Sequence, residues 1–237
     1  MISVEEHADH IEKLLATAVG TARRAGPDEL PLLRALGRVT AAPVLSPIDL
    51  PLFRNSQMDG YAVHSDDLLR TPATLAVIAD IPAGPATPAP LARGTAARIM
   101  TGAVVPEGAD CVVPVEDVEL APGAGGDPLD GATVTILAGR ASGEFVRDRA
   151  SDLAAGQQLL PSGQLLGARH LAALAAAGIT TVAVRRRVRV AVISTGAELV
   201  APGGTPRPGQ IFDSNLLALS AAVEETGAEL VLAERSS

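Results

Sequence analysis

The stretch Pro51-Leu-Phe-Arg-Asn-Ser-Gln-Met-Asp-Gly-Tyr-Ala-Val63 decides how we interpret the rest of the chain. Its polar residues lead into Asp59-Gly60, and an apolar Tyr61-Ala62-Val63 follows at once. Because Gly adopts positive φ without steric cost, Asp-Gly is typical of a turn. We therefore expect Asp59 on a loop at the start of a strand. Its carboxylate is either free for chemistry or bonded to its own turn.

A second polar turn lies further along the same segment. Thr101-Gly102 ends an apolar run, and Pro106 and Gly108 follow it. We expect the turns at Asp59 and Thr101 to form the rim of one cleft.

Composition limits the classes of protein to consider. The 237 residues are 47% hydrophobic with a formal net charge of -8, which fits an acidic globular protein long enough for two domains. A general nucleic-acid binder needs a basic face, which this acidic composition does not favour, so we expect no nucleic-acid partner. The single cysteine, Cys111, excludes an internal disulfide framework and lies in an apolar run, so we expect a buried, inert thiol. No signal peptide and no apolar run of membrane-spanning length occurs, which predicts a cytoplasmic protein without membrane contact.

Residues 1–50 and 144–184 have mixed helix and strand character, and we pair them into one discontinuous α/β domain. Ser3-Val-Glu-Glu6 is a capping box that predicts a helix over residues 3–23. The remaining expected elements are a short helix over 30–36, an extended segment over 39–45, a helix over 167–177 and a strand over 180–184.

Residues 51–143 differ from both flanks because short apolar runs alternate with Gly/Pro turns. This pattern is typical of a small β-barrel-like domain, here inserted into the first domain. The expected strands cover residues 61–63, 73–78, 96–100, 111–118 and 132–137.

Residues 185–237 begin a third domain, which we expect to be a three-layer parallel-sheet α/β fold. Arg185 to Arg189 is a charge run that we interpret as a solvated hinge. The continuous apolar run over 190–193 predicts a strand buried on both faces. A helix over 215–226, capped by Asp213-Ser214, and a strand over 229–233 complete one βαβ unit. One such unit buries too little apolar surface to stand alone, so we expect a truncated chain or a second copy.

The turn Ser194-Thr-Gly-Ala-Glu198 lies at the carboxyl end of the first of these strands, where open α/β sheets bind ligands. Small hydroxyl residues and backbone amides suit a phosphate, and Glu198 is a candidate to hold a metal or orient a ligand. A purely structural turn is at least as good an interpretation. No Walker A or dinucleotide-binding glycine pattern occurs, and the four histidines lack metal-ligand spacing, so the metal ligands stay unassigned.

Taken in order, six motifs resemble the molybdopterin molybdenumtransferase family, which includes MoeA and the gephyrin E domain. They extend over most of the chain. The motifs are Ser46-Pro-Ile-Asp-Leu-Pro51, Asn55-Ser-Gln-Met-Asp-Gly-Tyr-Ala-Val63, Arg98-Ile-Met-Thr-Gly-Ala103, Pro106-Glu-Gly-Ala-Asp110, Ser194-Thr-Gly-Ala-Glu-Leu199 and Gly209-Gln-Ile-Phe-Asp-Ser-Asn215.

The resemblance implies an enzyme of molybdenum cofactor biosynthesis. Such an enzyme inserts molybdate into adenylylated molybdopterin, releases AMP and uses Mg²⁺. It implies a homodimer, with molybdopterin adenylyltransferase and molybdenum-cofactor proteins as further partners. A non-catalytic pterin-binding or dimerising scaffold is the alternative that the gephyrin resemblance leaves open.

The resemblance also assigns roles to residues. Asp59, Thr101 and Glu198 would be catalytic, with Asp59 and Thr101 reaching in from the partner subunit. The substrate-binding positions would be Asn55, Ser56, Asp152, Ser194, Thr195, Gly196, Asp213 and Asn215.

Three positions depart from the family pattern. Arg54 and Ser151 replace residues that are usually acidic, and Ala197 replaces the first acid of Thr-Gly-Asp-Glu-Leu. The later Gly-Gly-rich loop of the family does not follow. We therefore expect this chain to be incomplete for catalysis.

Overall fold

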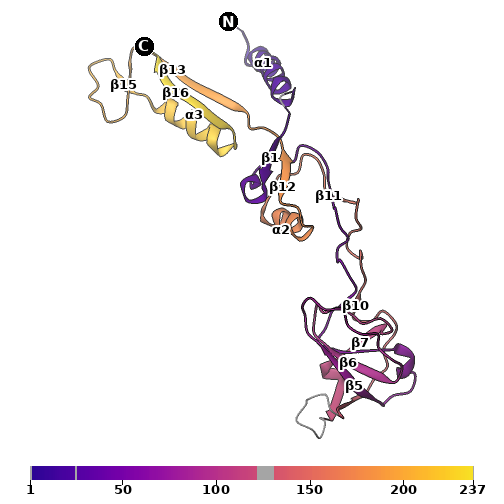
Figure 1. Cartoon of the computed structure of the whole chain (residues 1–237). Coiled ribbons are helices and arrows are strands. Elements are labelled where there is room, and N and C mark those ends of the chain that lie inside the picture. The colour runs from indigo at the N-terminus through magenta and orange to yellow at the C-terminus, as the bar shows by residue number, and fades with distance from the viewer. Residues whose placement is uncertain (1, 25, 122–130, 237) are drawn as a thin grey trace. The chain divides into compact units, whose positions relative to one another are not determined.

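The computed structural model describes residues 2–24, 26–121 and 131–236 (Figure 1). The chain divides into two compact units, Ser46–Gln157 and the combination of Met1–Leu45 with Gln158–Ser237. The first unit consists of strands and 3₁₀ turns, and the second also contains α-helices.

The Ser46–Gln157 unit is built on a curled six-stranded sheet with the strand order β7-β4-β6-β5-β9-β8. Adjacent strands run antiparallel except for β5 and β6, which are parallel. The strands are β4 (Gly60–Val63), β5 (Ala73–Ile81), β6 (Thr95–Ile99), β7 (Cys111–Pro114), β8 (Val118–Ala121) and β9 (Thr133–Ile136).

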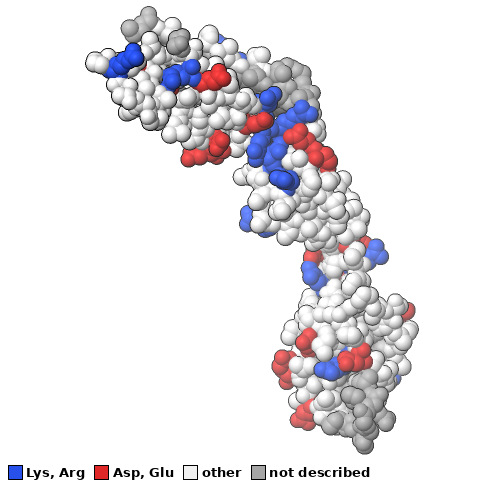
Figure 2. Space-filling model, turned by 60° about the vertical axis from the view of Figure 1, so that its left-hand side comes forward, with Lys and Arg blue, Asp and Glu red and all other residues white. Residues whose placement is uncertain are grey.

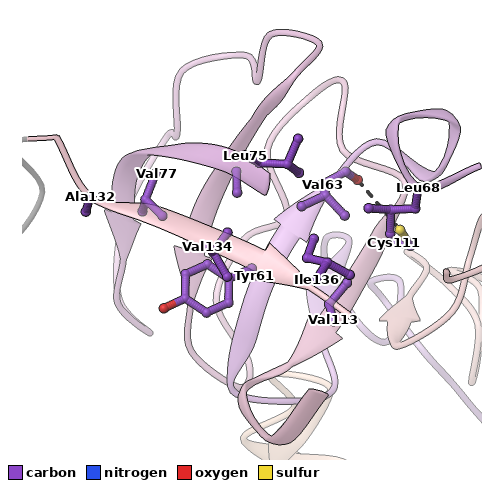
Figure 3. Packing of buried hydrophobic residues seen from close by; sticks show 11 residues of the cluster. Tyr61, Val63, Leu68, Leu75, Val77, Cys111, Val113, Ala132, Val134 and Ile136 are labelled. Atoms are coloured by element: carbon purple, nitrogen blue, oxygen red, sulfur yellow. Dashed lines mark hydrogen bonds between the residues drawn. The ribbon is translucent and has the colours of Figure 1, made fainter. Parts of the chain in front are cut away.

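Apolar residues cover both faces of the sheet because strand side chains point alternately to opposite faces. Tyr61 and Val63 of β4 lie in one core cluster, where Figure 3 shows their side chains beside Val134 and Ile136. Ala62, between them in sequence, lies in the second cluster. The strand that follows Asp59 is therefore buried along its whole length.

Cys111 lies at the start of β7 and is completely buried. Burial raises the pKa of its thiol to about 12, and the sulfur donates a weak hydrogen bond to the Val63 carbonyl (3.8 Å). The prediction of an inert thiol is confirmed, since a protonated, inaccessible sulfur is a poor nucleophile.

The prediction of one strand over 111–118 is wrong. β7 ends at Pro114, the 3₁₀ turn η3 (Val115–Asp117) follows, and β8 pairs with β9 on the other edge of the sheet. Proline has no amide hydrogen to continue a ladder, so the strand is interrupted there.

Shorter elements complete this unit. β3 (Asn55–Ser56) pairs antiparallel with β10 (Val146–Arg147), and the 3₁₀ turn η2 (Ser65–Leu68) follows β4. Two-residue strands of this kind have no periodicity that a sequence pattern can reveal.

In the second unit, two antiparallel ribbons connect distant parts of the chain. β1 (Asp28–Pro31) pairs with β12 (Thr181–Val184), and β2 (Val44–Leu45) pairs with β11 (Gln158–Leu160). Helix α2 (Ala168–Ala176) contributes Leu174 to the core that these ribbons share.

The prediction of a helix over 30–36 is wrong at its start. Residues as far as Pro31 belong to β1, and only Leu32–Ala35 form a 3₁₀ turn, η1. Pairing with β12 determines the conformation there and overrides local helix propensity.

The amino-terminal helix α1 covers Val4–Arg24. Its capping box is confirmed: the Glu6 amide donates to Ser3 Oγ (3.1 Å), and the Ser3 amide donates to Glu6 Oε2 (2.8 Å).

Among the described residues, no helix combines the length and apolar character needed to cross a membrane. Acidic and basic residues are interspersed over the face drawn in Figure 2.

The last part of the chain forms the predicted parallel βαβ unit. β13 (Arg189–Thr195) pairs in parallel with β16 (Glu229–Ser236), and α3 (Ser214–Glu225) lies along this pair (Figure 1). A short parallel pair, β14 (Leu199–Val200) with β15 (Ile211–Phe212), lies between β13 and α3 in sequence.

The prediction that residues 190–193 are buried on both faces is wrong for this chain. Val192 is buried, but Ile193 is 57% exposed. One partner strand and one helix cover β13 in the described residues, whereas a parallel strand needs layers on both faces to be buried.

Gly60 is the glycine whose replacement most directly tests the sheet. A Cβ at this position would lie 2.0 Å from the Val113 carbonyl oxygen on the neighbouring strand. We expect Gly60→Ala to lower the free energy of unfolding by about 2 kcal/mol or more, because backbone must shift to admit a methyl group. Urea unfolding measures this loss.

Gly84→Ala is the matched control, because a Cβ there meets nothing within 4 Å. We expect its midpoint to stay near that of the unsubstituted chain. Equal midpoints for the two variants would contradict the close approach of β4 to β7.

Candidate functional site

Two loops of the Ser46–Gln157 unit lie side by side, and the cleft that the two polar turns were expected to border stays a prediction. The Ser56 amide donates to the Ala103 carbonyl (3.0 Å), and the Gly102 amide donates to the Ser56 carbonyl (2.8 Å). Asn55 also forms a bridge with Val104. Backbone hydrogen bonds therefore fix the loop that carries Asp59 against the loop that carries Thr101.

The Asp59 carboxylate closes the contact between these loops. Its Oδ1 accepts hydrogen bonds from both the Thr101 amide and the Thr101 hydroxyl, each at 2.7 Å. These two donors, the amide first, hold the pKa of Asp59 below its usual range, and the positive charge of Arg98 acts in the same direction. The result is a carboxylate that stays ionised at the edge of an exposed loop.

The interpretation that Asp59 bonds only to its own turn is therefore wrong. Its carboxylate accepts from Thr101, which is 42 residues away in sequence. Its main-chain carbonyl meanwhile accepts from the Val115 amide (3.1 Å), so the start of η3, directly after β7, also supports the loop.

Ser56 and Asn55 behave differently from Asp59. The Ser56 side chain is 1% exposed, and its hydroxyl donates to the Met58 carbonyl (2.6 Å) and accepts from the Met58 amide (3.3 Å). Asn55 donates from Nδ2 to the Phe53 carbonyl (3.0 Å). The Ser56 side chain therefore shapes the loop between β3 and Asp59, and the Asn55 side chain bonds to the segment before β3.

Asp152 lies on a separate loop of the same unit. Its carboxylate forms an ion pair with Arg147, and its amide donates to the Leu50 carbonyl (2.9 Å). Arg54, where the family pattern has an acid, pairs with Asp148 (3.3 Å) and donates to the Ala109 carbonyl (3.2 Å). The charge at position 54 is thus partly neutralised within the unit.

The second group of candidates lies in the βαβ unit, around the end of β13. Ser194 Oγ donates to Asp213 Oδ2, and Asp213 Oδ1 accepts from the Leu216 amide (3.0 Å) as the N-cap of α3. The Ser194 hydroxyl, followed by this amide, holds the pKa of Asp213 below its usual range, and the Asn215 amide adds to the effect. Asp213, Ser194 and Asn215 are therefore brought together, and the predicted cap is confirmed.

The Ser194–Glu198 turn folds back on its own glycine. A Cβ at Gly196 would lie 2.6 Å from Glu198 Oε1 and 2.7 Å from Oε2, so a larger residue there would displace this carboxylate from its position. The Glu198 carbonyl accepts from the Ile211 amide (2.8 Å), which ties the turn to β15. Thr195 ends β13 opposite Ser236 of β16.

Among the residues that the structure describes, no group of three or more His, Cys, Asp or Glu side chains could hold a metal ion. Arg98 was assigned no role from the sequence, although this residue opens one of the six motifs and its positive charge acts on Asp59. Strand alternation within β6 could have placed it, since Ala97 and Ile99 are buried and Arg98 between them is exposed.

The model of the MoeA N-terminal region (domains I and II) matches residues 2–178. The chain belongs to the MoeA family. Relatives include molybdopterin molybdenumtransferase 2 of Mycobacterium tuberculosis, which is 41% identical over 98% of this chain and 54% of that protein. The Nostoc sp. molybdopterin molybdenumtransferase is 45% identical over 85% of this chain and 45% of that protein.

Solved structures agree with this assignment. A molybdopterin biosynthesis MoeA protein from Pyrococcus horikoshii has a TM-score of 0.74 and 36% identity, covering 94% of this MoeA-family chain and 57% of the solved one. A second structure of MoeA from this organism gives 0.79 and 30%, with 89% and 55% covered. The MoeA-family chain thus spans about half the length of the curated relatives it matches.

The Thr101 hydroxyl provides a direct test of the Asp59 contact. We expect Thr101→Val to raise the pKa of Asp59 part of the way to its ordinary value, because the amide donor remains and the hydroxyl donor is lost. Thr101→Ser should leave the pKa low. Carboxyl-carbon NMR titration measures both, and an unchanged pKa in Thr101→Val would show that the hydroxyl does not bond to Asp59.

Asp213 gives a pH-dependent prediction for α3. Its pKa is lowered on folding, so its contribution to stability is present above the unfolded-state pKa and is lost as pH falls through the folded-state pKa. We expect Asp213→Asn, which still caps a helix, to weaken this acid dependence while retaining the helix. Thermal unfolding followed by circular dichroism between pH 7 and pH 3 measures it. An identical pH profile for both proteins would contradict the role of Asp213.

Proposed function

We propose that this chain takes part in the insertion of molybdate into adenylylated molybdopterin, with release of AMP. Family membership supports the reaction class. The observation that carries the proposal is the Asp59 carboxylate, which Thr101 holds ionised and oriented through two 2.7 Å hydrogen bonds. That loop lies in the part of the chain that matches the family model.

The chemistry brings together two anions, molybdate and the pterin dithiolene with its phosphates. Catalysis then depends on positioning and on controlling charge and protons at the point of transfer. An ionised carboxylate on a fixed loop can accept a proton from an incoming ligand or orient water there. Asp59 would perform this step, and Thr101 would fix its orientation.

The turn around Ser194 suits the phosphate side of the substrate. Hydroxyl groups and backbone amides at the carboxyl end of a parallel strand are typical of anion sites. We propose that Ser194, Thr195 and Gly196 contact the substrate, with Glu198 orienting it. Asn55, Asp152 and Asn215 complete the proposed substrate-binding set. Ser56 and Asp213, which the sequence also proposed for it, support this set indirectly, because their buried side chains are bonded to Met58 and to Ser194 and Leu216.

The described residues could bind Mg²⁺ only together with phosphate groups of the substrate. No cluster of three or more carboxylate, imidazole or thiolate ligands occurs among them. Mg²⁺ commonly binds one or two carboxylates together with substrate phosphates and water. We therefore derive no step through the metal and assign the proton and positioning roles to side chains of the chain itself.

We also propose a cytoplasmic homodimer, with molybdopterin adenylyltransferase and molybdenum-cofactor proteins as functional partners. The resemblance implies that two subunits combine their loops in one cleft. This arrangement stays a prediction.

A non-catalytic scaffold that binds the pterin or dimerises is the second candidate. Ala197, in place of an acid, favours it because one carboxylate is missing beside Glu198. Binding of molybdopterin without AMP release would identify this function.

The deciding experiment measures molybdate-dependent AMP release from adenylylated molybdopterin. Release by the unsubstituted chain would overturn the expectation that this chain is incomplete for catalysis, and its rate is the reference for the variants. We expect Asp59→Asn to reduce release by about 100-fold or more, because amide replacement removes the charge and the proton acceptor. The variant should remain folded, since the loop carboxylate lies outside both apolar clusters of its unit.

Asp66→Asn is the matched control, because Asp66 is an exposed carboxylate of the same unit that pairs with Arg93 (2.7 Å). It should release AMP as the unsubstituted chain does. Equal loss in both variants, or no loss in Asp59→Asn, would argue against the catalytic role of Asp59.

A further inference from the structure

Phe145 has a backbone conformation that its side chain disfavours. Its φ is +57°, in the left-handed region that normally selects glycine or asparagine. It occupies the third position of a turn closed by the Val146 amide and the Gly143 carbonyl (3.2 Å). A bulky residue persists in this region only when its surroundings hold it there.

The carbonyl of Phe145 supports the loop that carries Asp59. It accepts a hydrogen bond from the Gln57 amide (3.0 Å), and the next residue, Val146, pairs with Ser56 in the β10–β3 ladder. Gln57 lies between Ser56 and Asp59. Rotation of Phe145 to negative φ would turn this carbonyl away, and the Gln57 amide would lose its hydrogen-bond acceptor.

The Arg140 side chain contacts the Phe145 ring. Its guanidinium lies over the ring with its carbon 5.7 Å from the centroid, within cation–π range. Asp117 and Glu144 fix the guanidinium, Asp117 through Nη2 and Glu144 through Nη1 (3.3 Å). The ring also packs against the core cluster that includes Ala103, two residues after Thr101.

We propose that Phe145, held in its strained conformation by Arg140, is a positioning residue for the Asp59–Thr101 pair. The Phe145 carbonyl holds the Gln57 amide and thereby the loop that carries Asp59. The Asp59 carboxylate in turn accepts the hydrogen bonds from Thr101. Phe145 makes no contact with substrate in this proposal. The inference rests on the proposed function only for its catalytic consequence, since the positioning itself is a property of the fold.

The test uses amide hydrogen exchange and the pKa of Asp59, neither of which requires activity. We expect Phe145→Leu, which removes the aromatic face, to speed exchange of the Gln57 and Thr101 amides by about tenfold, the effect of losing roughly one hydrogen bond. The pKa of Asp59 should rise, because the Thr101 donors would be less well held. Arg98, the charge that also acts on Asp59, is unchanged in this variant.

Ala150→Gly is the matched control, because Ala150 also has positive φ (+61°) and lies in the same unit. Relief of strain there should leave both amides and the Asp59 pKa unchanged. If Phe145→Leu fails to fold, Arg140→Lys keeps the positive charge, removes the planar group over the ring and should give a smaller change in the same direction.

Faster exchange of Gln57 alone, with Thr101 and the Asp59 pKa unchanged, would overturn the proposal because the strain would then be local. Activity separates this result from the proposed function. Should Asp59→Asn release AMP normally while Phe145→Leu still raises the Asp59 pKa, the positioning role stands and the proposed function fails.

Discussion

Contact between the Asn55–Asp59 and Thr101–Ala103 loops is the constraint on which the candidate site depends. Backbone hydrogen bonds at Ser56 set the two loops together, and the Asp59 carboxylate then bonds twice to Thr101. Each loop leads into or out of a buried strand, β4 or β6, and these strands are neighbours in the sheet. The precision of the site thus comes from the sheet, although the functional groups lie on loops.

The sequence indicated the parts of this arrangement that depend on local chemistry. Asp59-Gly60 predicted a turn, the short apolar runs between Gly/Pro turns predicted β4 and β6, and Asp213 predicted the cap of α3. These signals are strong because turn glycines, short apolar runs and cap side chains act within a few residues of each other. The same reasoning fails at Pro114, where the partner changes and one apolar run becomes two strands.

What the sequence could not predict depends on residues far apart. Gly143 signals a turn, but Phe145 has positive φ without being glycine, so its residue type does not indicate this conformation. Ser56 resembles a ligand-binding serine in the motif, yet its hydroxyl is buried in its own loop. The apolar run that ends at Ile193 correctly predicted a parallel strand, but burial depends on the other layers. In each case the deciding contact comes from a partner that periodicity does not reveal.

The two ionised aspartates differ in what their carboxylates have left to offer. Asp213 uses Oδ1 for the Leu216 amide and Oδ2 for the Ser194 hydroxyl, so its charge stabilises the start of α3. Asp59 receives both of its donors on Oδ1, and among the described residues no hydrogen bond reaches its Oδ2. Both oxygens of the buried Asp213 carboxylate are thus engaged, while Asp59 keeps one ionised oxygen without a hydrogen bond from the described residues, on a fixed and exposed loop. This asymmetry makes Asp59 the stronger candidate for proton transfer or for orienting water, and it leaves substrate contact near Asp213 to backbone amides.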